Sequence, residues 1–238
     1  MMFWIIATFF AYFAKGVVGF ANTLVFNSVM GFAAESAAIT PTEIFLSYPA
    51  NLIVAFKERK NINWKLSLTM AAMIVIGGIP GAIFLKNANG NLVKMICGII
   101  IMLLGIEMFL RERSSAKFKN TRLGMTVFGL TCGVMCGAYG VGALMGAYFS
   151  RVAGDTHEFK ANLNTVFVIE NTFRMINYIV IGLITFESFK RAVALLPVMV
   201  IGLLLGMLVS KHIDEKRAKH IVILVLIVSG AVLTITNI

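Results

Sequence analysis

Long apolar segments recur along the whole of this chain, and they limit its fold more than any other feature of the sequence. Short polar links separate eight such segments, which run roughly over 3–33, 39–56, 66–85, 92–110, 123–150, 162–183, 189–210 and 218–236. A helix of about 20 apolar residues crosses the roughly 30 Å hydrocarbon core of a bilayer. Charged residues make up 13% of the chain, against about a quarter in an ordinary soluble domain. The pattern predicts an all-α, polytopic membrane protein with one integral membrane domain.

The formal net charge is +10, but the basic residues lie almost entirely in the short links. Lys and Arg collect in the cytoplasmic loops of membrane proteins, so we expect a multi-pass protein of the cytoplasmic membrane and no nucleic-acid partner. The cysteines form no metal-ligand or redox motif, and no phosphate-binding, nucleophile or zinc-protease motif is present. We therefore expect no enzymatic activity, metal or cofactor. The expected partners are lipid and a small solute, and a homo-oligomer is compatible with the sequence.

The two halves of the chain resemble each other when the second is shifted by 121 to 125 residues. Residues 15–21 then fall on 136–142, and Gly77 and Gly81 fall on Gly202 and Gly206. Chance similarity between glycine-spaced apolar helices is the alternative. Because order and spacing agree along the whole half, we predict two homologous membrane repeats of about four segments each, over 1–116 and 117–238.

The first segment of each half is too long for a simple crossing. A continuous helix over 3–33 would be about 46 Å long, and both long segments contain a glycine-rich stretch near the middle. Each is either a long, kinked helix or a re-entrant hairpin. If all segments cross, the basic residues divide 11 to 8 between the two sides, whereas hairpins divide them 15 to four. The hairpin arrangement fits the positive-inside rule better. It gives each half three crossings, so the halves would be inverted repeats.

Glycine-interrupted helices leave backbone N–H groups unpaired, and helix N-termini carry partial positive charge. Two such interruptions facing each other would form an anion site deep in the membrane. The candidate substrate-binding residues at these interruptions are Gly16, Gly19, Gly137, Gly140 and Gly142. Close helix packing through small residues is the alternative for any one of these glycines.

Charged and amide side chains within the apolar segments are the second set of candidates, because such groups are costly in a membrane and usually functional. Lys15 adjoins the first glycine cluster, and Arg174 lies in the middle of 162–183. A cation at this depth suits an anionic substrate, and Asn22, Asn51 and Asn171 are further candidate ligands. Glu170 is a candidate for proton coupling. It also lies one helical turn from Arg174, so a purely structural ion pair is the alternative.

Several of these motifs resemble the TauE/SafE sulfite exporter family, also called the toluenesulfonate uptake permeases. They are Gly16-x-x-Gly19-Phe20, Pro41, Asn51 before a basic link with Asn61-Ile62-Asn63-Trp64, Gly77-Gly78-x-Pro80-Gly81, and the glycine cluster at 137–142. The resemblance implies a duplicated four-segment unit, transport of sulfite, sulfoacetate or related anions, and glycine clusters that form the substrate region. Ala21-Asn22 and Ala143 replace glycines that are common in the family's clusters, so the resemblance leaves the substrate open.

We therefore expect a secondary transporter that moves a small, sulfur-containing anion by alternating access around a site between the two halves. A non-transporting assembly or sensor protein and a passive anion channel are the competing hypotheses.

Overall fold

The computed structural model describes residues 1–30, 36–87, 90–112, 122–139 and 142–236. Within these ranges the chain is helical and contains no strand, which confirms the all-α prediction. The elements are α1 (Met2–Val18), α2 (Asn22–Met30), α3 (Ser36–Lys57), the short 3-10 helix η1 (Arg59–Asn61), α4 (Trp64–Asn87), α5 (Gly90–Glu112), α6 (Arg122–Tyr139), α7 (Ala143–Val152), α8 (Thr156–Val180), α9 (Phe186–Ser210) and α10 (Glu215–Ile235).

The outside of this bundle is apolar. Among the described residues, Trp64–Gly81 and Phe186–Ser210 are long and apolar enough to cross a membrane, and Met2–Val18 and Thr126–Gly137 are shorter apolar helices. Large side chains such as Ile76 and Leu208 are more than half exposed. Contiguous exposed apolar surface of this kind is unfavourable in water and suits contact with lipid.

The long apolar stretch at 3–33 does not form one helix. α1 ends at Val18, Gly19 follows with φ +94° and Ala21 with φ +76°, and α2 begins at Asn22. A left-handed residue ends a helix at little cost when it is glycine. In the second half, α6 ends at Tyr139 and α7 begins at Ala143. Both helices therefore end within the glycine-rich stretches, as predicted, but after Gly16 and Gly137, which lie inside helices.

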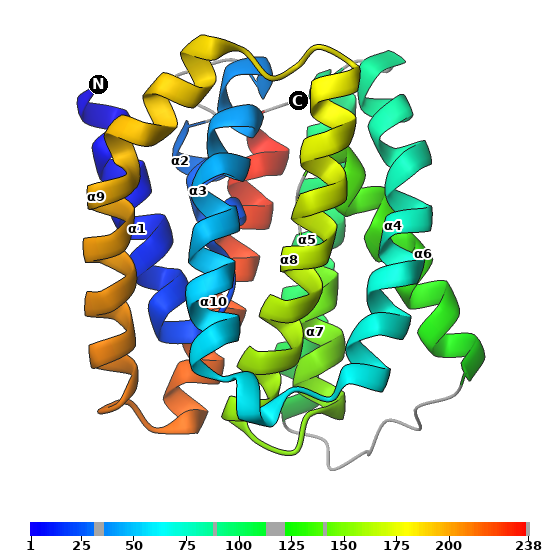
Figure 1. The fold of residues 1–238 in the computed structure, drawn as a ribbon. Helices are drawn as coiled ribbons and strands as arrows, with labels where there is room; N and C mark the ends of the chain where they lie inside the picture. The colour runs from blue at the N-terminus through cyan, green and yellow to red at the C-terminus, as the bar shows by residue number, and fades with distance from the viewer. Residues whose placement is uncertain (31–35, 88–89, 113–121, 140–141, 237–238) are drawn as a thin grey trace.

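Each broken segment returns to the end of the bundle from which it starts. In Figure 1, α1 and α3 both begin at the upper end, whereas α6 and α8 both begin at the lower end. The α3–α4, α7–α8 and α9–α10 links all lie at the lower end. The basic links 57–65 and 211–219 thus share one end, which we call the basic end, as the hairpin arrangement requires.

Two helix pairs form the most extensive contacts, and both are held together through glycines. In the α1–α9 pair, a Cβ atom added to Gly202 or Gly206 would press on the backbone carbonyl of Phe9 or Phe13, respectively. A Cβ on Gly16 would likewise collide with the backbone of α9. The packing alternative therefore accounts for Gly16, which allows the two backbones to touch.

The α4–α6 pair has the same construction. A Cβ atom on Gly77 or Gly81 would collide with the backbone carbonyl of Leu130 or Val134, respectively. A Cβ on Gly137 would collide with Gly78 in the same way.

The two pairs correspond residue by residue. Adding 121 to Phe9 and Phe13 of α1 gives Leu130 and Val134 of α6, and subtracting 125 from the α9 glycines of the same contacts gives Gly77 and Gly81 of α4. The first helix of each half thus packs on a helix of the opposite half: α1 packs on α9, and α6 packs on α4. α3 packs against α8, and α5 against α10.

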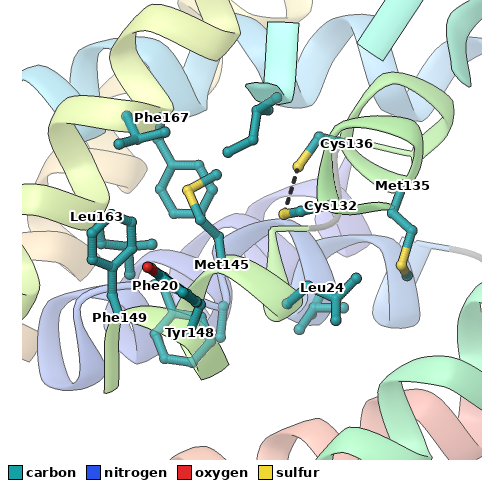
Figure 2. Packing of buried hydrophobic residues seen from close by; sticks show 14 of the residues in the cluster. Phe20, Leu24, Cys132, Met135, Cys136, Met145, Tyr148, Phe149, Leu163 and Phe167 are labelled. Carbon is teal, nitrogen blue, oxygen red and sulfur yellow. Dashed lines mark hydrogen bonds between the residues drawn. The ribbon is translucent and has the colours of Figure 1, made fainter. Parts of the chain in front are cut away.

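Buried apolar side chains form two clusters. One lies largely between α1, α3 and α9, and the other gathers around α6, α7 and α8. Figure 2 shows Phe20, Met145 and Phe167 in the second cluster, with the thiols of Cys132 and Cys136 at one side of it. Most of the buried polar side chains among the described residues belong to α1, α2, α3 and α8.

Candidate functional site

A cavity of about 610 Å³ extends from Lys15 on α1 to the links at the basic end. The last turn of α1 through Phe20, the end of α3, the α7–α8 link and the end of α9 line it. The residues from Gly16 to Phe20, around the end of α1 at Gly19, all line this cavity. Gly16 and Gly19 are thus the predicted site glycines that adjoin it, and their role in substrate binding stays a prediction.

The cavity is lined by more cations than anions. Its lysines are Lys15, Lys57, Lys160 and Lys211, and its carboxylates are Glu58 and Asp155. Both carboxylates have partners already. A Glu58 oxygen lies 2.9 Å from His157 Nδ1, and Asp155 accepts a hydrogen bond from the backbone N–H of Glu158, at 2.7 Å, as the N-cap of α8. A cavity lined in this way attracts anions.

Lys15 is the most unusual of these cations, because its side chain is fully buried. Its ammonium group donates hydrogen bonds to the amide oxygens of Asn51 and of Asn22, the latter at 3.3 Å. Both acceptors are neutral, and among the described residues Lys15 has no carboxylate within ion-pair distance. A buried charge without a counter-ion is costly. An anion in the adjoining cavity would supply that counter-ion.

Arg174 is neutralised within the protein. Its Nε lies 3.2 Å from a Glu170 oxygen, its Nη2 lies 3.6 Å from a Glu43 oxygen, and Nη2 also donates a 2.7 Å hydrogen bond to Asn171. All of these side chains are buried. The ion-pair alternative for Glu170 and Arg174 is therefore present in the structure, and Glu43 of α3 adds a second carboxylate.

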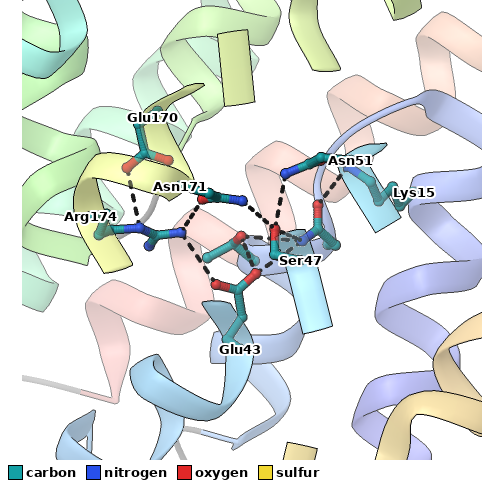
Figure 3. Close-up of polar contacts among 9 residues, drawn as sticks. Lys15, Glu43, Ser47, Asn51, Glu170, Asn171 and Arg174 are labelled. Atoms are coloured by element: carbon teal, nitrogen blue, oxygen red, sulfur yellow. Dashed lines mark hydrogen bonds and ion pairs between the residues drawn. The ribbon is translucent and has the colours of Figure 1, made fainter. Parts of the chain in front are cut away.

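Side-chain hydrogen bonds join Lys15 and Arg174 into one network (Figure 3). Asn22 donates to a Glu43 oxygen at 3.0 Å and to the hydroxyl of Ser47 at 3.1 Å. Asn51 and Asn171 donate to the same Ser47 hydroxyl, each at 3.3 Å. α1, α2, α3 and α8 thus each contribute to a continuous polar cluster that begins at the inner end of the cavity.

A second lysine lies over the α1 break. The side chain of Lys160 passes so close to Gly19 that its Cγ would be 2.8 Å from an added Cβ, and its ammonium group donates to Ser210 at 2.9 Å. Asn164, one turn further along α8, donates to the free carbonyl of Gly19 at 3.1 Å. α8 therefore holds the break in place, and it sets a cation beside it.

The structure brings together Lys15, Asn22, Asn51, Glu170, Asn171 and Arg174 of the predicted site residues. In the second half, Gly137 packs against α4, and Gly142 lies against the ring of Phe167. Gly140 lies outside the described residues. Their role in substrate binding stays a prediction. Six further residues belong to the polar cluster or line the cavity but were not among the predicted site residues: Thr23, Glu43, Ser47, Lys57, Lys160 and Lys211.

No group of three or more His, Cys, Asp or Glu side chains within the described ranges could hold a metal ion.

A comparison with protein-family models identifies the family of the chain. Residues 4–233 match the model described as "Sulfite exporter TauE/SafE". The chain belongs to this family. The match confirms the resemblance seen in the motifs, and it makes the chain an integral membrane protein of a family of sulfur-anion transporters. Comparisons with curated proteins and with solved structures find no match.

Proposed function

We propose that this TauE/SafE family member is a secondary transporter of a small, sulfur-containing anion, such as sulfite or an organosulfonate, across the cytoplasmic membrane. The observation that carries the proposal is Lys15, a fully buried cation with neutral partners at the inner end of a lysine-lined cavity. The anion would bind at this ammonium group, on the side that faces the cavity, with Gly16 and Gly19 beside it. Asn22 and Asn51 hold the ammonium in place.

Alternating access of two inverted repeats, over 1–116 and 117–238, is the mechanism that we propose. The reciprocal packing of α1 on α9 and α6 on α4 supports this arrangement. The cavity leads to the basic end, which is the cytoplasmic end by the positive-inside rule. Beyond Lys15, the cluster around Glu43 and Arg174 joins α3 to α8, and in the proposed mechanism it closes the route to the other end. Transport requires that this closure open while the cavity closes.

Flux measurements in proteoliposomes test the proposal. Vesicles preloaded with unlabelled sulfite or sulfoacetate should take up a trace of the same labelled anion transiently above equilibrium, and uptake should saturate. Such counterflow requires a carrier that alternates. A passive channel would give flux without saturation or counterflow, and a non-transporting assembly or sensor protein would give no flux. Either result would contradict the proposal.

A further inference from the structure

Glu43 combines burial with an incompletely used carboxylate. Its side chain is 1% exposed. One oxygen, Oε1, accepts hydrogen bonds from Thr23 at 2.7 Å and from Asn22 at 3.0 Å. The other, Oε2, has the Arg174 guanidinium 3.6 Å away and makes no hydrogen bond within the described structure. A buried carboxylate oxygen without a donor is costly, and a proton bound to it removes the charge that causes the cost.

One side chain connects this carboxylate to the proposed anion site. The amide oxygen of Asn22 accepts from Lys15, and the amide nitrogen of the same side chain donates to Glu43. Asn51, which also accepts from Lys15, reaches the same region through Ser47. A change of charge at Glu43 therefore acts on Lys15 across a single amide group, in a region from which water is largely excluded.

Counted over the whole cluster, the buried charges are balanced while the site is empty, although none of the described carboxylates lies within ion-pair distance of Lys15. Lys15 and Arg174 carry two positive charges, and Glu43 and Glu170 carry two negative ones. An anion at Lys15 would leave the buried region with excess negative charge, which is unfavourable in a membrane. Protonation of one carboxylate removes that excess. Anion binding and proton binding thus favour each other, and linkage makes the effect reciprocal.

We propose that Glu43 binds the proton that this protein carries together with its anion, an inference that rests on the transport function proposed above. The step converts the Glu43 carboxylate and one proton into a carboxylic acid, with the proton on the oxygen that lacks a donor. When the anion leaves on the other side of the membrane, the acid loses the same proton there. One proton and one anion cross together.

Glu170 was the carboxylate that the sequence suggested for coupling, but its position suits the role less well. Its oxygen pairs with Arg174 Nε at 3.2 Å, on the side of the guanidinium away from Lys15. The charged and titratable groups that face Glu43 are Lys15 and Tyr12 of α1 and Arg174, Glu170 and Tyr178 of α8. α2 presents only the neutral Asn22 and Thr23. Of the two carboxylates, Glu43 is the one with a direct link to the Lys15 site.

The test separates exchange from proton-driven accumulation. Wild type, Glu43→Gln, Glu170→Gln and the control Glu187→Gln, whose exposed carboxylate lies in the first turn of α9, are reconstituted, and the membrane potential is clamped at zero. Exchange of labelled for unlabelled sulfoacetate or sulfite is measured without a pH gradient, and accumulation is measured with an acidic exterior. Glutamine resembles the protonated carboxyl, so Glu43→Gln should retain exchange within about threefold of wild type. It should lose the gradient-driven accumulation that wild type and Glu187→Gln retain.

Three outcomes would overturn the inference: Glu43→Gln still accumulates anion under the gradient, Glu170→Gln alone loses accumulation, or wild type exchanges anion but ignores the gradient. If wild type exchanges neither anion, the transport function itself is wrong, and the inference falls with it.

A measurement on wild type keeps the inference testable should Glu43→Gln fail to fold. Sulfoacetate is added to purified protein in weakly buffered detergent with a pH indicator, because this anion carries no titrating group near neutral pH. The inference predicts uptake of about one proton per anion bound. Binding without proton uptake would contradict it.

Discussion

The break between α1 and α2 and the break between α6 and α7 share their helix packing but differ in the polarity of the side chain one turn before them. Both follow a helix that packs through glycine on a helix of the other half. However, Lys15 lies one turn before the first break, and its counterpart 121 residues later is Cys136. The thiol of Cys136 is buried 3.9 Å from that of Cys132, beside an apolar cluster (Figure 2).

The comparison separates what builds the fold from what builds the site. The glycine contacts occur twice because both halves must let helix backbones touch. The buried cation Lys15, the cavity and the amides of Asn22 and Asn51 lie at the first break. α8 of the second half supplies Arg174 and Glu170, and α3 supplies Glu43. The proposed anion site is therefore asymmetric even though the packing around it is repeated.

The largest expected difference between the two breaks comes from removing the Lys15 ammonium and, separately, the thiol of Cys136, which occupies the corresponding position in the second half. Lys15→Met should lower sulfite or sulfonate exchange at least about 100-fold, equivalent to about 2.8 kcal/mol, because the anion loses its buried counter-ion. Cys136→Ala removes a small apolar group and should leave exchange within about twofold. Exchange rates in proteoliposomes measure both.

Lys190 provides a matched control, because this exposed lysine lies near the start of α9, at the opposite end of the molecule from the cavity. Lys190→Met should behave as wild type. Equal losses in Lys15→Met and Cys136→Ala would show that the two breaks contribute alike and would contradict the asymmetric site.

The repeated half of the comparison concerns stability. Gly81→Ala and Gly206→Ala each place a Cβ against a backbone carbonyl of the partner helix. Each should destabilise the protein by about 1–3 kcal/mol, since the helices must move apart. Gly78→Ala is the control, because the nearest atom to its added Cβ is 3.7 Å away, an ordinary contact. Thermal unfolding in detergent should show similar decreases in Tm for Gly81→Ala and Gly206→Ala and little change in Tm for Gly78→Ala. A lower Tm in only one of the first two variants would contradict equivalent packing.

Hydropathy and glycine spacing predicted much of this architecture. The apolar segments predicted the helices, and the basic links predicted which links share an end. The register of Gly77 and Gly81 with Gly202 and Gly206 anticipated the repeated contacts. The sequence did not distinguish Gly16 and Gly137 from the residues at the breaks. A glycine that opens space for a neighbouring helix looks, in sequence, like one that interrupts its own helix.

The candidate site was predicted in part, for a similar reason. Lys15 and Arg174 stand out because charge in an apolar segment is conspicuous. The partners of Lys15 and the second carboxylate of Arg174, Glu43, come from other helices and cannot be read from the local sequence. A periodic signal on α3 was available: Glu43, Ser47 and Asn51 recur every four residues and so share one helical face. No local pattern identifies Lys160, since in sequence it belongs to a basic link, and only the fold lays it across Gly19.

Substitution of Lys160 should have the smallest effect on transport. This residue tests whether charge or geometry matters at the first break, because the fold lays its side chain over Gly19. Its ammonium group is held by the neutral hydroxyl of Ser210, so it adds positive charge to the cavity without contacting Lys15 directly. Lys160→Met keeps the aliphatic part that covers Gly19 and removes only the charge. We expect KM for the anion to rise about fivefold with the maximal rate little changed, which is the pattern of weakened ground-state binding. Added salt should narrow the difference, since it screens charges near water. A lower maximal rate at unchanged KM would instead show that Lys160 acts by holding the α1 break, and the break would then owe its function to geometry rather than to charge.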